Sequence, residues 1–400
     1  MSPLGSDANN YNSIAKRVCR RATRIAVCIP LLLVSAGVSA GVIWSGDLET
    51  GNFLQWHQTG DTKTPFFAGI PAYGRPPAPN PLTGSKPADY YGDGSLVHLV
   101  TNPVRQGKFA ARIVVKNSQN GSEIQDCDSG GKVCSRRRTE LQMHRALSDH
   151  YNGMPYMSER WVSVSYFVPA DWDSTRGNGM LHVLQLKPRN DGSSIGPALS
   201  LRLENEGWKI KHKWDDKVNP IGADVPSEQS MEYSSLRPSA TDWPGGLVDF
   251  PNQAESQKAL ADFNKGAWTD WVFKIKFDAR GSLQGGTGYL SAWKRAGSGP
   301  WVKVLHITPK VTTRGGLTFD HGICFNSPKT STNNGGFDVQ AGFYIAKEQV
   351  WNLPANRVIY VDNVKIGDSF AEFKDMSPDG STPDQAASSV PLPPEKLGAQ

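Results

Sequence analysis

The chain has few cysteines and a modest share of hydrophobic residues, and outside its first 40 residues it has almost no excess of charge. Its 400 residues include five cysteines, and 38% of them are hydrophobic. Residues 1–40 contain five basic residues and one acidic residue, so they carry most of the formal net charge of +5. The remainder is close to neutral, which argues against a nucleic-acid-binding protein, because such proteins carry a marked excess of basic side chains. Affinity for an anionic polymer would have to come from a local basic cluster.

Residue patterns of helical length are also scarce. The chain contains 40 Gly and 28 Pro, and both residues are poor helix formers. Short segments in which apolar and polar residues alternate recur instead between Gly41 and Phe373, for example at 161–168 and 271–277. Such alternation predicts half-buried strands. We therefore expect an all-β fold, a single-domain β-jelly roll (concanavalin-like sandwich), with long loop insertions at 60–95 and 215–256.

The first 40 residues have the features of a signal peptide. A basic stretch precedes about sixteen apolar or small residues, which end in V-S-A at Ala40. The apolar run is short for a membrane span, which needs roughly 20 residues. We expect cleavage after Ala40 and a secreted or periplasmic protein; the alternative is an uncleaved leader, which would then be the only contact with a membrane. The folded domain is expected at 41–375, and a disordered tail at 376–400, where large apolar residues are few.

Three cysteines follow the leader. Cys127 and Cys134 flank the turn-forming segment D-S-G-G-K-V. In an oxidising compartment such a pair is expected to form a disulfide, and two free thiols are the alternative. Cys324 lies in an apolar stretch, so we expect it to be buried as a small hydrophobic residue.

Three segments combine strand alternation with charged or reactive side chains. A strand over the first segment, 138–144, would separate a polar face from an apolar one: Arg138, Glu140, Gln142 and His144 against Thr139, Leu141 and Met143. The apolar set would be buried, and the polar set would be costly to bury without partners. An ordinary solvated strand face is the alternative.

The other two segments are weaker signals when each is taken alone. Alternation over 181–188 would divide the side chains into two faces: Leu181, Val183, Gln185 and Lys187 against His182, Leu184 and Leu186. Alternation over 342–348 would place Tyr344 with Ala346 and, on the opposite face, Phe343, Ile345 and Lys347. A single Tyr in a strand is usually a packing residue.

Together the three segments resemble a known arrangement. The runs R-T-E-L (138–141), Q-L-K (185–187) and G-F-Y (342–344) follow the order found in jelly-roll polysaccharide lyases, a set that includes the heparin lyase I-like, glucuronan lyase-like and alginate lyase families. The opening V-I-W-S-G-D-L-E-T-G-N-F-L-Q-W and the ending V-I-Y-V-D-N-V-K-I-G-D are also similar to the first and last strands of the heparin lyase I-like group. The resemblance covers residues 41–373.

The resemblance implies an enzyme that cleaves a uronic acid-containing anionic polysaccharide by β-elimination and leaves an unsaturated uronate end. The proton at carbon 5 is too weakly acidic to remove until the neighbouring carboxylate is neutralised. A base then takes the proton, and an acid protonates the leaving oxygen at carbon 4. Carried over by position, Arg138 and Gln185 would neutralise the carboxylate, and Tyr344 would be the acid, or both acid and base. His144 is the first candidate for a separate base and His182 the second.

Other charged and polar side chains are expected to bind the substrate. Lys187 stands where the alginate lyases have His, so it would bind substrate anions and leave the identity of the base open. Glu140 would orient Arg138 through a charge-assisted contact. The remaining substrate-binding candidates are Gln142, Arg145, Arg189 and Lys347.

A structural calcium site is a separate expectation. Asp47, Glu49, Asp362 and Asn363 lie on the predicted first and last strands, which are neighbours in many jelly rolls. Their oxygen atoms suit calcium, and surface carboxylates near a strand end are the alternative. No spacing of His and Cys predicts zinc, and no organic cofactor is expected.

Two other functions use the same scaffold. A glycoside hydrolase would need two carboxylates across the scissile bond, and no strand carries them at a spacing such as E-x-D-x-x-E. A non-catalytic carbohydrate-binding protein would keep the sheet and the 12 Trp residues, but it would not need Arg138, Gln185 and Tyr344 to converge. The fold alone does not separate these functions. We expect a monomer whose partner is the polysaccharide and not nucleic acid.

Overall fold

Two antiparallel β-sheets and their nearest connections make up the part of the chain that the computed structural model describes. All of these residues belong to one unit, Ala40–Gln400. They are residues 41–56, 67–68, 97–116, 126–127, 134–143, 154–155, 157–172, 181–188, 197–204, 207–215, 228–233, 260, 262–314, 317–324, 337–345 and 356–383.

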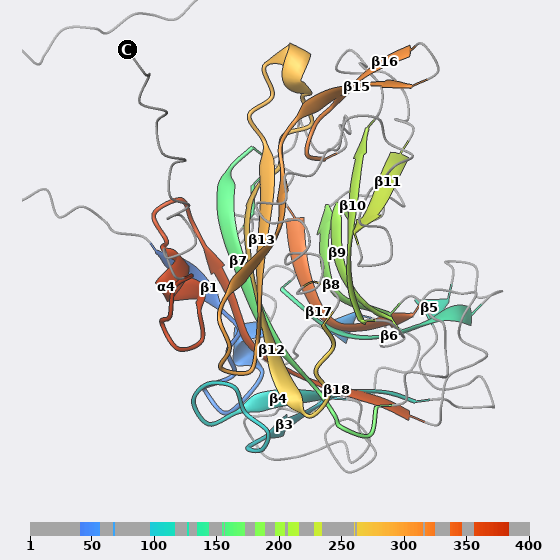
Figure 1. Ribbon diagram of the computed structural model, residues 1–400. Helices are drawn as coiled ribbons and strands as arrows, with labels where there is room; N and C mark the ends of the chain where they lie inside the picture. Colours follow the sequence, from blue (N-terminus) through green and yellow to red (C-terminus); the bar gives the residue numbers. More distant parts are fainter. Residues whose placement is uncertain are drawn as a thin grey trace, which may run out of the picture. The chain divides into compact units, whose positions relative to one another are not determined.

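The first sheet, which we call the β7 sheet, has eight strands in the order β14-β13-β12-β7-β18-β4-β3, with β1 paired to β18 (Figure 1). Its strands are β1 Val42–Ser45, β3 Val97–Val100, β4 Ala110–Lys116, β7 Glu159–Val168, β12 Ala267–Lys276, β13 Tyr289–Ala296, β14 Val302–Ile307 and β18 Asn356–Gly367. The pairing of β7 with β12 continues without a register shift over the full length of both strands. These two strands therefore form a regular centre for the sheet.

The second sheet, which we call the β17 sheet, also has eight strands, in the order β11-β10-β9-β8-β17-β6-β2, with β5 paired to β6 (Figure 1). Its strands are β2 Phe67–Ala68, β5 Asp126–Cys127, β6 Cys134–Gln142, β8 Leu181–Pro188, β9 Leu199–Glu204, β10 Gly207–Asp215, β11 Glu228–Tyr233 and β17 Phe337–Ile345. The smaller elements are the hairpin of β15 Lys310–Arg314 and β16 Leu317–His321, the 3-10 turns η1 Leu54–Trp56 and η2 Ser282–Gln284, and the short helix α4 Phe373–Met376.

The apolar faces of the two sheets meet in one core. Trp208 of β10 lies with its ring centroid 5.5 Å from that of Trp271 of β12 and 5.8 Å from that of Tyr166 of β7. Trp271 also stacks on Phe273, with centroids 5.9 Å apart. All four side chains are almost completely buried, so each stabilises the sandwich through its apolar area. The prediction of an all-β sandwich is confirmed.

A register shift in β8 reverses the predicted face of His182. His182 pairs with Arg202 of β9, but Leu184 pairs with Leu201, so two residues of β8 span one residue of β9. Val183 and Leu184 are consecutive, and both are fully buried in the core. Such a bulge interrupts the two-residue alternation, which was the basis of the prediction. His182 therefore shares the polar face with Gln185, and the prediction that it lies opposite Gln185 is wrong.

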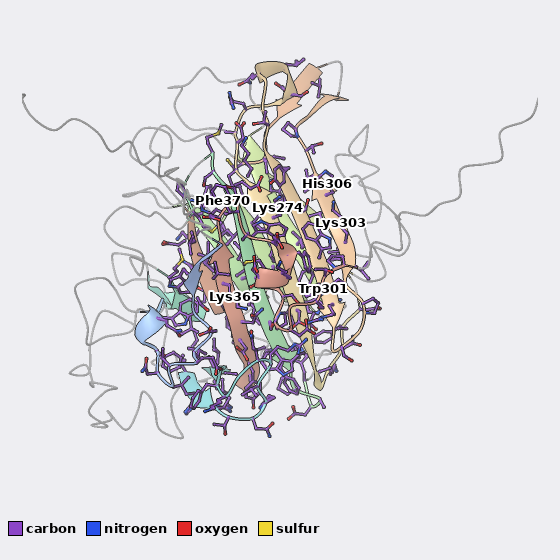
Figure 2. The ribbon with its side chains drawn as sticks, turned by 90° about the vertical axis from the view of Figure 1, so that its left-hand side faces the viewer. Lys274, Trp301, Lys303, His306, Lys365 and Phe370 are labelled. Carbon is purple, nitrogen blue, oxygen red and sulfur yellow. The ribbon has the colours of Figure 1, made fainter. Side chains whose placement is uncertain are left out.

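The outer face of the β7 sheet carries a second, smaller apolar cluster, which includes three Trp side chains. Phe373 of α4 packs edge-on against Trp161, Trp293 and Trp301, with ring centroids 6.2, 5.4 and 5.0 Å away. Cationic side chains lie over the same three rings, namely Lys274, Lys303 and Arg295. Figure 2 looks onto this face and labels Lys274, Trp301 and Lys303. The helix therefore covers apolar rings that the open face of the sheet would expose to water.

The segment after α4 is part of the fold as far as residue 383. Asp379 accepts a hydrogen bond from Arg295 Nη1 at 2.8 Å, and Trp301 Nε1 donates to Ser381 Oγ at 2.9 Å. The sequence pattern predicted a disordered tail from residue 376, so the predicted boundary comes too early, and residues 384–400 lie outside the described part. The predicted leader, 1–40, also lies outside it, and within the described residues no helix is long and apolar enough to cross a membrane.

A buried ion cluster fastens the loop before β4 to the outer face. The carboxylate of Asp270, which is 1% exposed, lies 2.7 Å from Arg105 Nη2 and 2.8 Å from Arg295 Nη2, and it accepts a hydrogen bond from Ser165 Oγ. Removing one member of a buried charge cluster leaves its partners desolvated and uncompensated.

Asp270→Ala is therefore expected to lower the free energy of unfolding by about 3–5 kcal/mol, measured by urea denaturation. Lys374→Ala is the matched control, because Lys374 forms an ion pair with Glu372 at the surface and both side chains are more than half exposed. That variant should unfold like the parent protein. Equal losses in both variants would contradict the structural role of the buried cluster.

One crossing of β6 and β17 accepts only glycine. Gly342 lies opposite Glu140 and has a φ of +144°. A Cβ atom at this position would lie 2.3 Å from the carbonyl oxygen of Thr139, which is far inside van der Waals contact. Glycine therefore allows the two strands to approach at the point where Glu140 projects from β6.

Gly342→Ala and Gly285→Ala separate the steric cost at this crossing from the cost of a positive φ. Gly285 has a φ of +71°, and a Cβ there would have no atom within 4 Å. We expect Gly285→Ala to cost about 1 kcal/mol of unfolding free energy. Gly342→Ala should cost a further 1–3 kcal/mol, roughly, because a backbone atom must move. Equal costs in a denaturation experiment would show that the crossing has room for a side chain.

Candidate active site

A first row of polar side chains crosses the face of the β17 sheet that points away from the core. Tyr344 of β17 lies opposite Arg138 of β6 on one side and His182 of β8 on the other. His182 in turn lies opposite Arg202 of β9, which lies opposite Lys209 of β10. We call this set the tyrosine row. It brings together three of the predicted catalytic positions from strands that are far apart in the sequence.

A second row lies parallel to the first. Gln340 of β17 lies opposite Gln142 of β6 and Gln185 of β8, and Gln185 lies opposite Ser200 of β9. Ser200 is opposite Lys211 of β10. We call this set the glutamine row. Gln185 is thus on the same face of the sheet as Tyr344.

His182 and Tyr344 are in direct ring contact. Their centroids are 5.3 Å apart with planes at 59°. His182 is 6% exposed, whereas Tyr344 is half-buried, so the phenol ring is the more accessible of the two. An imidazole beside a phenol supplies two groups that can transfer protons within a short distance of one another.

Gln185 of the glutamine row forms a buried pair with Glu140, which lies between the two rows on β6. Gln185 Nε2 donates a hydrogen bond to Glu140 Oε1, and it lies 3.4 Å from Gln340 Oε1 as a second acceptor. Gln185 is 2% exposed and Glu140 is fully buried. Glu140 was expected to orient Arg138, whose side chain lies outside the described part of the chain. The described partner of Glu140 is Gln185.

Basic side chains on β9 and β10 extend both rows, and the sequence analysis did not single them out as site residues. Trp208, Ile210 and His212 are buried on the core face, so Lys209, Lys211 and Lys213 lie on the polar face with Arg202. Burial and, to a smaller extent, the charges of Lys211 and Arg202 together lower the pKa of Lys213 to about 8. The alternating run W-K-I-K-H-K-W (208–214) could have predicted this feature, because a strand with this alternation must place its three lysines on one face.

Ser200 contributes a polar group to the same region. It is fully buried, and within the described part of the chain its hydroxyl has no hydrogen-bond partner. A buried hydroxyl costs free energy unless it finds a partner. In the strand register Ser200 lies between Gln185 and Lys211 in the glutamine row.

Several predicted site residues lie outside the described part of the chain. For Arg138 and Gln142 the structure describes the backbone and register only. The four predicted residues of which nothing is described are His144, Arg145, Arg189 and Lys347. Lys187 is half-buried on the polar face opposite Asp338 of β17. The roles given to these residues stay predictions.

The four residues predicted to bind calcium are engaged in other contacts. Asp362 accepts hydrogen bonds from the backbone N–H groups of Arg105 and Gln106, at 2.8 and 3.1 Å. Glu49 accepts two from the loop before β4, those of Lys108 and Phe109. The other two predicted ligands bond to nearby groups: Asp47 Oδ1 accepts from Gln55 Nε2, and Asn363 Nδ2 donates to Met376 O. In the described residues no three or more His, Cys, Asp or Glu side chains form a group that could hold a metal ion, so these contacts give calcium no support and it stays an untested prediction.

The cysteine predictions have two outcomes. Cys127 of β5 lies opposite Cys134 of β6 in the strand register, which is compatible with the predicted disulfide. The side chains of both residues lie outside the described part, so the bond stays a prediction. Cys324 is 1% exposed in the core, and its prediction as a buried residue is confirmed.

Comparison with known proteins identifies the family. A model of the polysaccharide lyase family matches residues 48–365. An endo-β-1,4-glucuronan lyase from the fungus Trichoderma reesei is similar in structure, with 15% identity, a TM-score of 0.45 and coverage of 71% of this chain and 90% of that one. No curated protein sequence matches the chain.

Two further solved structures are similar at lower TM-scores. A marine alginate lyase from Aplysia kurodai has 12% identity and a TM-score of 0.34, over 68% of this chain and 86% of that one. A β-glucanase catalytic domain from Podospora anserina has 12% identity and a TM-score of 0.37, over 83% and 99%. The family match covers every strand that carries the tyrosine and glutamine rows, and the chain belongs to the polysaccharide lyase family.

Proposed function

We propose that this polysaccharide lyase cleaves a uronic acid-containing polysaccharide by β-elimination at the tyrosine row. The observation that carries the proposal is the convergence of His182, Tyr344 and Gln185 on one face of the β17 sheet. This set supplies a base, an acid and an amide that can bind a carboxylate. A non-catalytic sugar-binding protein would not require these three groups on adjacent strands.

In the proposed reaction the uronate carboxylate binds between Arg138 and Gln185. Neutralising this charge lowers the cost of the enolate that forms when the proton at carbon 5 leaves. His182 takes this proton, and Tyr344 protonates the bridging oxygen at carbon 4 as the bond breaks. The ring contact between His182 and Tyr344 supports His182 in this role, ahead of His144, which lies outside the described residues.

The basic side chains on β9 and β10 support an anionic polymer as substrate. Lys209, Lys211 and Lys213 alternate along one strand, so neighbouring ammonium groups project at intervals of roughly 7 Å. Arg202 lies beside them in the tyrosine row. These basic side chains on β9 and β10 can therefore bind carboxylates of sugar units next to the one that reacts. Secretion through the predicted leader would bring the enzyme to such a polymer.

The purified protein is expected to produce ultraviolet absorbance from at least one polymer in a panel of polyuronates. β-Elimination creates a carbon–carbon double bond conjugated with the carboxylate at the new non-reducing end, and hydrolysis does not. Absorbance recorded together with reducing ends therefore identifies the reaction. Reducing ends without absorbance would assign the protein to the hydrolases, and neither signal would favour a binding protein.

Tyr344→Phe provides the matched test of the site. It should lower kcat at least about a hundredfold, because a positioned proton donor contributes this much or more, while polymer binding stays unchanged. Tyr360→Phe on the β7 sheet is the control, since Tyr360 is half-buried and packs on Phe167 away from the rows. If Tyr344→Phe keeps the parent activity, Tyr344 is not the acid.

Binding of the polymer is expected to weaken as the pH rises through about 8. The pKa of Lys213 is lowered to about 8, so its ammonium group is charged below this pH and neutral above it. Affinity is measured in the Tyr344→Phe protein to avoid turnover. In Lys213→Arg the charge persists, so the decrease between pH 7 and pH 9.5 should be smaller. The same decrease in both proteins would remove Lys213 from the binding surface.

A further inference from the structure

A line of aromatic side chains crosses the outer face of the β7 sheet, on the side of the Asp270 ion cluster that is remote from α4. Trp268 of β12 lies opposite Phe167 of β7, and Phe167 lies opposite Tyr360 of β18. Tyr360 in turn lies opposite Arg112 of β4. The line therefore crosses the four neighbouring strands β12-β7-β18-β4 in one register (Figure 1). We call these four residues the aromatic strip.

The side chains of the strip point away from the core. The residues on both sides of Phe167, Tyr360 and Arg112 along their strands belong to the core, so these three side chains project outward with Trp268. All four are half-buried, whereas two of the three Trp rings beneath α4 are only 7% exposed. Part of each side chain is thus open to a ligand. Neighbouring aromatic rings that stay accessible on a sheet face are typical of an interaction site.

Contacts within the strip hold the rings in place before a ligand binds. The centroid of Phe167 lies 5.7 Å from that of Trp268, with planes at 60°, and 5.7 Å from that of Tyr360, with planes at 79°. Fixed rings lower the free energy needed to order a binding site. The indole Nε1 of Trp268 is not buried and has no hydrogen bond within the described part of the chain, so its N–H group can donate to a ligand.

Arg112 supplies a positive charge at one end of the strip. Within the described residues its guanidinium group forms no ion pair or hydrogen bond. Its neighbours in the register, Tyr360 and His98, are not acidic. Asp362, the next residue of β18 on this face, is buried and accepts backbone N–H groups of the loop before β4. A guanidinium group binds a carboxylate through two parallel hydrogen bonds. The strip thus combines accessible rings with a group that favours an anionic ligand.

We propose that the aromatic strip is a second, non-catalytic binding site for the uronic acid polymer, with a sugar ring on Trp268 and a uronate carboxylate on Arg112. The choice of a uronate rests on the proposed function. The C–H groups on one face of a sugar ring pack well on an aromatic ring, and the carboxylate complements the guanidinium group. Neighbouring strands lie roughly 4.8 Å apart, so the strip spans roughly 14 Å, which suits a short stretch of the polymer.

The second site would act on long substrates only. The outer face of the β7 sheet and the polar face of the β17 sheet lie on opposite sides of the core. A short oligomer cannot reach both faces, whereas a long polymer can bind to both at once. The contact at the strip then raises the effective concentration of the polymer at the tyrosine row. Its loss should raise KM for the polymer and leave kcat unchanged.

Hydroxyl-radical footprinting tests the site directly. The Tyr344→Phe protein, which suppresses turnover, is oxidised with and without polyglucuronate, alginate or an uncharged β-glucan, and oxidation of Trp268 and Tyr360 is measured by mass spectrometry. We expect at least one of the two polyuronates to lower this oxidation several-fold and the uncharged glucan to leave it unchanged. Phe370 is 70% exposed, is labelled on the same face in Figure 2 and lies outside the strip, so its oxidation should not change.

Kinetics with two lengths of the cleaved polyuronate give a second readout. Trp268→Ala and Arg112→Gln should each raise KM for the long polymer at least about tenfold and leave kcat/KM for a short oligomer unchanged. Arg112→Lys keeps the positive charge and should keep most of the affinity. Phe370→Ala is the matched control and should behave like the parent enzyme. Tyr360→Phe keeps its ring, so it remains a control for turnover at the tyrosine row.

Four results would overturn the inference. They are no protection of the strip by either polyuronate, equal protection by the uncharged glucan, equal changes for polymer and oligomer in Arg112→Gln, and a dimer in light scattering that Trp268→Ala dissociates, since a second copy of the chain would then occupy the strip. Arg112→Gln removes no ring contact, so the test holds even if Trp268→Ala does not fold. Failure of the proposed function is a different observation, namely no unsaturated product from the polymer panel, and footprinting does not depend on turnover.

Discussion

The site depends on an unequal number of residues between the same two rows on neighbouring strands. Between the glutamine row and the tyrosine row, three residues lie on β17 (Gln340 to Tyr344), two on β8 (Gln185 to His182) and one on β9 (Ser200 to Arg202). The extra residues have to be accommodated, and β8 does so by burying Val183 and Leu184 side by side. On β17 and β6 the additional positions are Gly342 and Glu140, which lie opposite each other between the rows.

This unequal spacing also explains why a carboxylate can lie in the middle of the site. Gly342 has no side chain, so the backbone of β6 at Thr139 and Glu140 can lie close to β17 at this point. A larger residue on β17 would meet this backbone and move β6, which carries Glu140. On the core side of the same sheet, the hydroxyl group of Tyr166 donates a hydrogen bond to the carbonyl oxygen of Val183 in the β8 bulge. This bond helps to hold the bulge that places His182 on the polar face. The position of the Glu140–Gln185 pair on the polar face therefore depends on how β8 packs on the core through its bulge.

The sequence pattern predicted the features that depend on local alternation. Leu141 and Met143 are buried as predicted, since each strand residue two positions along returns to the same face. The pattern failed for His182, because a bulge is fixed by pairing with β9 and β17 and leaves no mark in the spacing of β8 itself. It also gave no sign of the contact between Glu140 and Gln185, because such a contact requires the register of β17 between them. The three lysines of β10 were visible as an alternating run, but only the buried partners Trp208 and Ile210 establish which face they occupy.

Acidic and basic side chains of this nearly neutral chain gather in different parts of the described structure. Near β1 and β18, Glu49 and Asp362 accept backbone N–H groups, and Asp270 binds two arginines, so these negative charges are compensated within or beside the β7 sheet. On the polar face of β10 lysines alternate over five residues, and Glu232 of β11 lies opposite Lys211 in the strand register. A charge that is compensated by fixed donors nearby contributes little field at a distance. The gathering of basic side chains on β9 and β10 is therefore a local feature of the fold, and the net charge of the whole chain does not report it.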